Sequence, residues 1–374
     1  MSLTRSEVMK QLFAVVTLVC VAQLSGCIGA MNGPTEDCTF AEDVKNSDTL
    51  YILSYDILAF DDEMIQSFEQ TYGYTVEFIL ADDAGGILNQ LMLTKGKPQA
   101  DLAIGLDNTY MQTAIDFCLL KPHKMEPENV QSHLSTTYDS IGVPFDYGFV
   151  CLNLDATQLN DNRTEPTTID DLTKIEWYGK VSIPSPLTSS PGRAFFFSTL
   201  MNYEYDVERT LEWWRSMKQN DLIITTGWTE SYEIHYSGGY GVWTEGHIGD
   251  AAITVSYCHS PGVEAFFSEN STFSTAVLYE HTHFKQIEYA TIPNGKVNSD
   301  AATKFIQYLL TTEINQKMPT SNYMYSVLNH TDLPAESGYK WNSPTPQSEL
   351  SFDQQKIELT IDELLMKWSE VMLS

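Results

Sequence analysis

The sequence has 374 residues, of which 43% are hydrophobic and 12% aromatic, and this composition excludes a disordered chain. The length exceeds what one hydrophobic core usually serves, which favours two lobes or domains. The 50 acidic and 21 basic residues give a net charge of −29, which argues against nucleic acid or an anionic membrane face as a partner. This charge suits a cationic ligand, and the alternative interpretation is an acidic surface that maintains solubility.

The first residues have the pattern of a targeting segment. Two basic residues precede the mostly apolar residues 12–24, which end in Leu24-Ser25-Gly26-Cys27. This ending resembles a lipobox, which implies cleavage before Cys27 and lipidation of its thiol. We therefore predict a signal peptide over residues 1–26 and a tether over residues 27–48. An uncleaved membrane anchor is the alternative, but the apolar stretch is shorter than the ~20 residues that a spanning helix needs.

Strands alternate with helices after the tether. The predicted strands are residues 49–55, 74–80 and 101–106. This repetition is the signature of a mostly parallel α/β sheet, whose ligands gather at the carboxyl ends of its strands. Tyr55, Asp83 and Asp107 all fall at such ends, so we predict a binding site near them.

An apolar run at residues 143–154 divides the chain. Pro144 disfavours helical geometry in the residue before it, and the run is too apolar for a wet surface. We predict a buried strand that crosses between two α/β lobes, with residues 282–289 as the returning strand and a ligand cleft between the lobes. Lobe A is predicted to comprise residues 49–144 and 287–374, and lobe B residues 145–286. The last predicted helix, over residues 357–372, has an apolar face for docking on a core.

Two further features of lobe B bear on a ligand. Ser189 and Ser190 precede Pro191, which is a strong signal for the start of a helix. Free backbone N–H groups and hydroxyls at such a start can bind an anion, and the alternative is a simple helix cap. Trp228 stands just past another predicted strand end, where it either offers a stacking platform or packs in the core.

The cysteines and histidines give no catalytic or metal motif. Once Cys20 and Cys27 are set aside, four cysteines remain, and they allow three full pairings that the sequence cannot rank. The four are Cys38, Cys118, Cys151 and Cys258. Cys258 and His259 are adjacent, so in an extended chain they point opposite ways and form a poor catalytic dyad. His281 and His283 could hold a metal, but a solvated strand explains them better. Three sequons, at Asn162, Asn270 and Asn329, fit an exported protein.

Several segments together resemble the thiamine-binding proteins of bacterial ABC importers. They include Val-Pro-Phe-Asp-Tyr-Gly at residues 143–148 and Thr-Gly-Trp-Thr-Glu-Ser-Tyr at residues 226–232. The other matching segments are residues 101–108, 188–192, 255–261 and 319–325. The resemblance runs from about residue 50 to the C-terminus. It implies the type II periplasmic-binding-protein fold, an α/β fold with two lobes on a two-strand hinge, and binding of thiamine and its phosphate esters without chemistry.

The resemblance also implies roles for individual residues. Asp83 resembles a carboxylate of the family's ligand site, Ser189 and Ser190 resemble the pair at its phosphate end, and Trp228 resembles a ring-contacting tryptophan. The full set that we predict to bind the ligand is Tyr55, Asp83, Ala84, Ser189, Ser190, Trp228, Tyr257, Cys258, His259, Ser260 and Tyr323. Ala84 replaces a glycine of the family, Cys258 and His259 replace hydroxyl residues, and Val263 stands where the bacterial proteins have a tyrosine.

The resulting hypothesis is a lipid-anchored, extracytoplasmic, monomeric solute-binding protein that is not an enzyme and uses no cofactor or metal. It would deliver thiamine or a thiamine phosphate to an ABC permease. Because no Walker motif is present, a separate subunit must hydrolyse ATP. Two alternatives remain: a binding protein for another small ligand, such as Fe(III) or a different cationic heterocycle, and a thiaminase-like enzyme. An Fe(III)-binding relative would use adjacent tyrosines, which the sequence lacks, and a thiaminase-like enzyme would need a cysteine nucleophile in the cleft.

Overall fold

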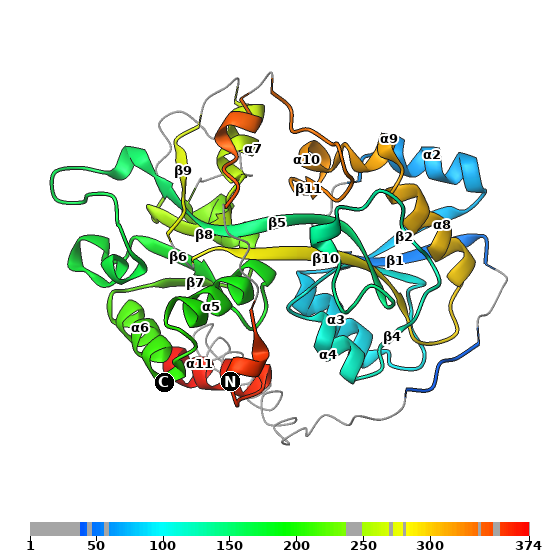
Figure 1. Ribbon diagram of the computed structural model, residues 1–374, viewed down its shortest axis with the longest axis horizontal. Coiled ribbons are helices and arrows are strands. Elements are labelled where there is room, and N and C mark those ends of the chain that lie inside the picture. Colours follow the sequence, from blue (N-terminus) through cyan, green and yellow to red (C-terminus); the bar gives the residue numbers. More distant parts are fainter. Residues whose placement is uncertain are drawn as a thin grey trace, which may run out of the picture. The chain divides into compact units, whose positions relative to one another are not determined.

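Two long antiparallel strands, β5 (Gly142–Asp155) and β10 (Phe284–Pro293), lie side by side at the centre of the sheet in the computed structural model of this protein (Figure 1). The structure describes residues 38–42, 47–55, 60–236, 249–268, 272–279, 282–335, 338–346 and 352–373. The predicted signal peptide, the lipidation site Cys27 and most of the tether lie outside the described residues, as do Asn270 and His281.

The predicted strand crossings are confirmed. β5 is buried along its length except at half-buried Tyr147, and β10 is buried except at Lys285. The strand order of the main sheet is β2-β1-β3-β10-β5-β8-β6-β7, so β10 and β5 join the parallel strands of the two lobes. A continuous apolar run is what such a strand needs, because both of its faces are covered.

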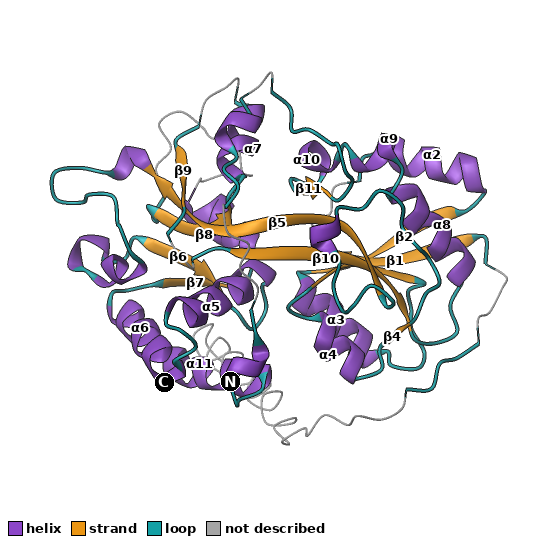
Figure 2. Ribbon diagram, viewed as in Figure 1, coloured by secondary structure: helices purple, strands orange, loops and turns teal. Residues whose placement is uncertain are grey.

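Lobe A covers its part of the sheet with helices on both faces (Figure 2). Its strands are β1 (Thr49–Tyr55), β2 (Thr75–Ala81), β3 (Leu102–Asp107), β4 (Leu120–Lys121) and β11 (Tyr325–Ser326). Its helices are α2 (Asp62–Tyr72), α3 (Ala84–Leu93), α4 (Met111–Asp116), α8 (Ser299–Leu309), α9 (Thr312–Asn315) and α10 (Met318–Ser321). Asp61 caps α2 by accepting a hydrogen bond of 2.7 Å from the Met64 N–H, and Gly73 ends it in the left-handed conformation.

Lobe B is built around one large aromatic and aliphatic core. Its strands are β6 (Val181–Pro184), β7 (Ile223–Thr225), β8 (Ile253–Tyr257) and β9 (Ser274–Val277). Its helices are α5 (Ser190–Asn202), α6 (Val207–Gln219), the π-helix η5 (Glu230–Tyr236) and α7 (Ser260–Phe267). The 3-10 helices of the described chain as a whole, with η1 in lobe A, are η1 (Ser132–Leu134), η2 (Ala156–Gln158), η3 (Ile169–Thr173), η4 (Ile175–Trp177), η6 (Lys340–Asn342) and η7 (Gln354–Lys356).

The helix α11 (Ile361–Leu373) packs in lobe B, so the prediction that all of residues 287–374 belong to lobe A is wrong for this element. Its Trp368 ring lies edge-on to Trp214 of α6, with the ring centroids 5.6 Å apart. Figure 1 shows α11, in red, beside α6. The amphipathic pattern predicted that this helix docks on a core, and it carried no information on which lobe supplies that core.

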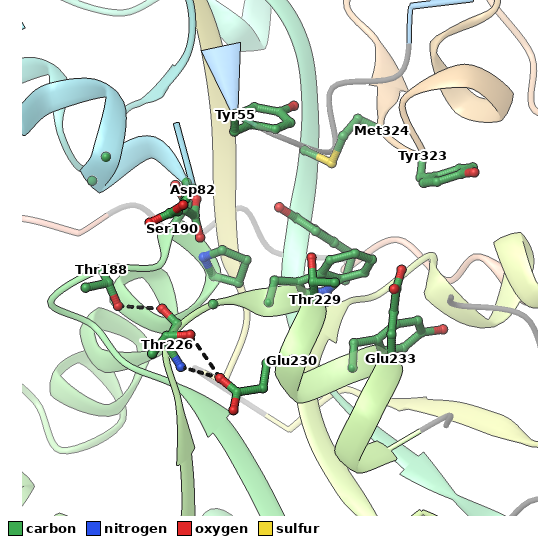
Figure 3. A pocket seen from close by; sticks show the side chains of 18 of the residues that line it. Tyr55, Asp82, Thr188, Ser190, Thr226, Thr229, Glu230, Glu233, Tyr323 and Met324 are labelled. Atoms are coloured by element: carbon green, nitrogen blue, oxygen red, sulfur yellow. Dashed lines mark hydrogen bonds between the residues drawn. The ribbon is translucent and has the colours of Figure 1, made fainter. Parts of the chain in front are cut away.

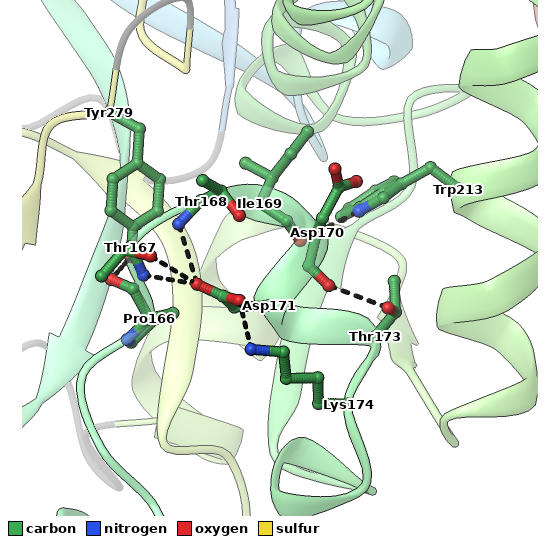
Figure 4. Close-up of polar contacts among 10 residues, drawn as sticks. All are labelled: Pro166, Thr167, Thr168, Ile169, Asp170, Asp171, Thr173, Lys174, Trp213 and Tyr279. Atoms are coloured by element: carbon green, nitrogen blue, oxygen red, sulfur yellow. Dashed lines mark hydrogen bonds and ion pairs between the residues drawn. The ribbon is translucent and has the colours of Figure 1, made fainter.

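A polar cluster joins η3 to α6 in lobe B (Figure 4). The Asp171 carboxylate accepts hydrogen bonds from the backbone N–H groups of Thr167 and Thr168 at 2.7 and 3.1 Å and pairs with Lys174 at 2.5 Å. The Lys174 ammonium and these N–H donors hold the pKa of Asp171 well below its usual range. Trp213 of α6 donates its indole N–H to the Ile169 carbonyl at 3.0 Å, which fixes the turn against the helix.

Two disulfides resolve the pairing that the sequence left open. Cys38 pairs with Cys118, which ties the segment before β1 to lobe A, and Cys151 of β5 pairs with Cys258 at the end of β8. Within the described residues, every cysteine is therefore bonded. No helix in this part of the chain is long and apolar enough to span a membrane.

Candidate ligand-binding site

A cavity of about 610 Å³ lies between the two lobes, and both contribute its walls (Figure 3). Lobe A supplies the end of β1, the start of α3 and the turn after α10, whereas lobe B supplies the starts of α5 and α7, the turn after β7 and η5. The lining residues that the argument uses are Tyr55, Asp82, Asp83, Ser190, Thr226, Trp228, Glu230, Tyr232, Glu233, Tyr257, Ser260, Glu288, Asn322 and Tyr323. As the strand-end rule predicts, these positions cluster at one edge of each half of the sheet.

One wall of the cavity is aromatic. Trp228 stacks on Tyr232 of η5 with ring centroids 5.0 Å apart and planes 13° from parallel, and its indole N–H donates to Ser256 Oγ at 2.8 Å. Tyr257 stacks on the buried His259 ring at 5.2 Å and receives a hydrogen bond of 3.1 Å from Gln286. The rings are thus held by neighbours before any ligand enters, which lowers the entropy cost of stacking on them.

Tyr323 occupies a strained backbone position at the cavity. Its backbone φ of 56° lies in the left-handed region, which bulky residues rarely adopt. Its side chain is 38% exposed. The buried His259 ring shares a short hydrogen bond with the Tyr323 carbonyl, and Phe267 meets the Tyr323 ring edge-on at 5.7 Å. Strain of this kind persists where the surrounding structure imposes it, often at ligand sites.

Carboxylates are the charged groups of the cavity. Asp82, Asp83, Glu230, Glu233 and Glu288 line it, and no Lys, Arg or His stands among the described lining residues. Glu230 accepts hydrogen bonds of 2.9 Å from both the backbone N–H and the hydroxyl of Thr226, as the dashed lines of Figure 3 mark. The electrostatic potential inside the cavity therefore favours a cation.

Asp83 joins the starts of two helices. Its carboxylate caps α3 by accepting a hydrogen bond of 2.7 Å from the Ala84 N–H, and it also accepts from the Ser189 hydroxyl and the Ser190 N–H of α5. Burial raises the pKa of Asp83 to about 6, although these donors oppose the shift. The helix start that we predicted as an anion site thus faces a carboxylate of the protein itself.

A second group of polar residues forms the floor of the cavity. The Tyr55 hydroxyl donates to the Glu288 carboxylate at 2.7 Å, and the Asn322 amide donates to Tyr55 Oη at 3.1 Å and to Asp146 at 2.6 Å. Gly105 of β3 makes room for the Tyr55 ring, because a Cβ there would come within 2.4 Å of it. Burial raises the pKa of Asp146 to about 8 and holds that of Glu288 well above its usual range.

The cavity brings together most, but not all, of the predicted ligand-binding residues. Those that line it are Tyr55, Asp83, Ser190, Trp228, Tyr257, Ser260 and Tyr323. Ala84 and Ser189 are buried beside Asp83 and do not line the cavity. That the lining residues bind a ligand stays a prediction.

The prediction was wrong in placing Cys258 and His259 at the cavity. The Cys258 sulfur is buried in its bond to Cys151, so it can neither contact a ligand nor act as a nucleophile. Burial lowers the pKa of His259 to about 4, and its ring lies behind Tyr257 and the Tyr323 backbone. Both positions follow from the tight turn that begins α7, which points them into the protein.

The sequence interpretation predicted Tyr55 but missed the other residues of the floor, and of the cavity carboxylates it predicted only Asp83. Glu288 is part of the predicted returning strand, where Lys285 and Gln286 are polar as well, so nothing in the sequence marked this carboxylate out. Asn322 adjoins the predicted Tyr323, but nothing in the sequence places it against Asp146, 176 residues away. Among the described residues, no three His, Cys, Asp or Glu side chains gather closely enough to hold a metal ion.

Two lobes on a pair of crossing strands, with a preformed cavity between them, define a solute-binding protein. The model of the bacterial extracellular solute-binding protein family matches residues 63–329, and the chain belongs to this family. It is therefore a substrate-binding protein and not an enzyme, as predicted.

Two curated relatives are periplasmic. The chain is 24% identical over 290 residues to the thiamine-binding periplasmic protein of Escherichia coli strain K12, covering 76% of this chain and 83% of that one. It is 22% identical over 323 residues to the thiamine-binding periplasmic protein of Salmonella typhimurium, covering 85% and 92%. Their location agrees with the predicted extracytoplasmic one.

Solved structures confirm the predicted fold class. A periplasmic thiamin binding protein superposes with a TM-score of 0.74 at 22% identity, covering 89% of this chain and 99% of that one. A ferric binding protein from Campylobacter jejuni superposes with a TM-score of 0.66 at 18% identity, covering 86% and 99%. Because proteins with different ligands share this fold, the fold alone does not identify the ligand.

Proposed function

We propose that this protein captures thiamine, free or as a phosphate ester, outside the cytoplasm and delivers it to an ABC import permease. The observation that carries the proposal is the cavity, which combines the stacked rings of Trp228 and Tyr257 with carboxylates and has no basic side chain among its described lining residues. Thiamine joins a permanently cationic thiazolium to a flat aminopyrimidine. Aromatic faces contribute ~0.5–2 kcal/mol each to binding a cation.

The relatives support the same ligand. Both bacterial proteins described above are named as thiamine-binding, and their alignments with this chain extend over most of each protein. The two alternatives have less support. The described cysteines are all in disulfides, which leaves a thiaminase-like reaction without its nucleophile, and the sequence has no adjacent tyrosines for Fe(III).

The test is calorimetric titration of the purified protein with thiamine, together with mass spectrometry of any ligand that co-purifies. We expect saturable one-to-one binding, and titration with ferric citrate should give no tyrosinate-to-iron absorption band. A protein that binds no thiamine, or that carries a different co-purified ligand, would overturn the proposal.

The proposal includes an anchor and partners that are inferred from the sequence. Lipidation at Cys27 after removal of 26 residues would leave 374 − 26 = 348 residues held at the outer face of the membrane. The protein would act as a monomer beside a permease with a separate ATPase subunit. Cys27→Ser should release the protein from the membrane fraction or leave it unprocessed. A processed Cys27→Ser protein that stays on the membrane would contradict the anchor.

A further inference from the structure

The floor of the cavity contains two carboxylic acids on the two crossing strands. Asp146 of β5 and Glu288 of β10 are paired in the antiparallel register, and directly opposed residues in such a pair have Cβ atoms about 4.5–5.5 Å apart. Asp146 is completely buried and Glu288 is 4% exposed. They are also linked through Tyr55 and Asn322, which bridge from one carboxyl group to the other.

The groups that face this pair are acidic or neutral, whereas the buried Arg193 of α5 lies over the Tyr110 ring and acts on Asp107. β1 presents Tyr55, β8 presents Tyr257, β3 presents Asp107, and the segment after α10 presents Asn322. Within β10 itself, Gln286 donates to Glu288 at 2.9 Å. No Lys, Arg or His of the described chain forms an ion pair with either carboxyl group, and one Asp146 oxygen has no hydrogen-bond partner.

Two neighbouring carboxyl groups in such surroundings cannot both be ionised at low cost, because burial and mutual repulsion disfavour the second charge. In the empty cavity a proton therefore provides the positive charge that the pair requires. Only Glu288 of the two lines the cavity, so a ligand can reach the pair through Glu288 alone. A permanently cationic ligand over Glu288 supplies the same charge without a proton.

We infer that Glu288 selects for cationic ligands because the charge of a bound cation replaces the proton held by the Asp146–Glu288 pair. Capture of the ligand then releases one proton to the solvent. This inference rests on the proposed function, because it takes the thiazolium of thiamine as the cation. The charge balance is complete: one cation enters the site, one proton leaves it, and the net charge of the floor is unchanged.

The consequence is a pH-dependent affinity with a defined slope. Where the pair holds its proton, coupling to the release of one proton raises the association constant about tenfold per pH unit. Burial raises the pKa of both groups, and the value of about 8 for Asp146 places neutral pH within this range. A ligand without a positive charge has no means of displacing the proton and should show no such slope.

The experiment is calorimetry of thiamine binding in two phosphate-free buffers with different enthalpies of ionisation, such as MOPS and Tris, between about pH 6.5 and pH 8. The difference in heat measures the number of protons released, and we expect about one. Thiochrome, the flat and uncharged oxidation product of thiamine, should bind with no buffer-dependent heat. Thiamine binding without proton release overturns the inference alone, whereas the absence of any thiamine binding overturns the proposed function with it.

Two variants locate the proton. Glu288→Gln imitates the protonated acid, so its affinity should stay constant with pH while that of the unchanged protein rises about tenfold between pH 6.5 and pH 7.5. Asp146→Asn should likewise remove the proton release. Asp82→Asn is the matched control, because it removes an exposed carboxylate of the cavity and should keep the full release. Release that persists in both Glu288→Gln and Asp146→Asn would overturn the inference, and the two-buffer measurement on the unchanged protein does not depend on the folding of any variant.

Discussion

Trp228 connects the cavity to the polar interior of lobe B, and this double contact determines how its removal must be tested. One face of its ring stacks on Tyr232, and its indole N–H is bonded to Ser256. A loss of ligand affinity in a variant could therefore come from the stacking surface or from a displaced support. Substitutions that remove the two contacts separately distinguish these causes.

We expect Trp228→Ala to weaken thiamine binding by ~1–3 kcal/mol, because it removes an aromatic face from the cavity. Trp228→Phe keeps a ring but loses the bond to Ser256, so it should lose less affinity. Calorimetry gives the affinities, and thermal unfolding of the ligand-free proteins is the control. A large drop in stability with unchanged affinity would identify Trp228 as a core residue only.

The start of α5 leads to a prediction for phosphorylated ligands. A phosphate that displaces the Asp83 carboxylate from the start of α5 would gain the donors of Ser190, which lines the cavity, and of Ser189, which is buried behind it. A helix start favours such a negative charge. We expect thiamine monophosphate to bind at least as tightly as thiamine. Replacing both serines with alanine should cost the ester roughly 1–3 kcal/mol, the strength of charge-assisted hydrogen bonds, and should cost thiamine little. Equal losses for the two ligands would mean that the serines only cap the helix.

The sequence predicted part of this site for physical reasons. Tyr55 and Asp83 follow strand ends, and such ends meet at one edge of a parallel sheet whatever the loops do. Cys258 and His259 could not be placed, because a tight turn after β8 decides which way each side chain points. Glu288 was missed because alternation along a strand buried on both sides does not show which buried side chain borders a cavity.

At the scale of elements, α11 is the part of the chain whose position was least predictable. The strand β5 could be recognised from its own residues, since most positions of a 14-residue strand buried on both faces must be apolar. The helix α11 has one apolar face, which several surfaces in the protein could have covered. Its contact with α6 is set by the complementary shapes of Trp368 and Trp214, which become neighbours only after folding.

Trp368 should therefore contribute strongly to the stability of lobe B. Trp368→Ala removes a buried ring and should lower the free energy of unfolding by about 3–5 kcal/mol. Met366 lies on the same helix but is 50% exposed, and Met366→Ala should change the stability by less than about 0.5 kcal/mol. Denaturant unfolding followed by tryptophan fluorescence measures both. Similar effects in the two variants would mean that α11 is only loosely attached.

At the scale of the whole molecule, buried carboxyl groups set the pH dependence of stability. Burial raises the pKa of Asp146 to about 8 and that of Glu288 well above its usual range, so the folded chain binds their protons more tightly than the unfolded chain does. The contribution of the two protonated groups to the free energy of unfolding is fully present below about pH 4 and is lost as the pH rises towards 8. His259, with its pKa lowered to about 4, acts in the opposite direction only below about pH 6.5.

Between pH 6.5 and pH 8 the ligand-free protein should therefore become less stable as the pH rises. We expect a loss of at least about 1 kcal/mol, and each kcal/mol lowers the melting temperature by about 2–4 °C in a chain of this size. Asp146→Asn should flatten the dependence, and Asp82→Asn should not. A melting temperature that is constant or rises over this interval would show that the pair is already ionised at neutral pH.

Each lobe combines early and late segments of the chain in its core, and this affects how the protein folds during synthesis. The core of lobe A joins Leu50 to Met318, and the core of lobe B joins Val150 to Trp368. Neither lobe can complete its core until nearly the whole polypeptide has left the ribosome, because each lobe waits for a late segment. A nascent chain of this design stays incompletely folded through most of its synthesis, which is the condition that threading through a secretion channel requires.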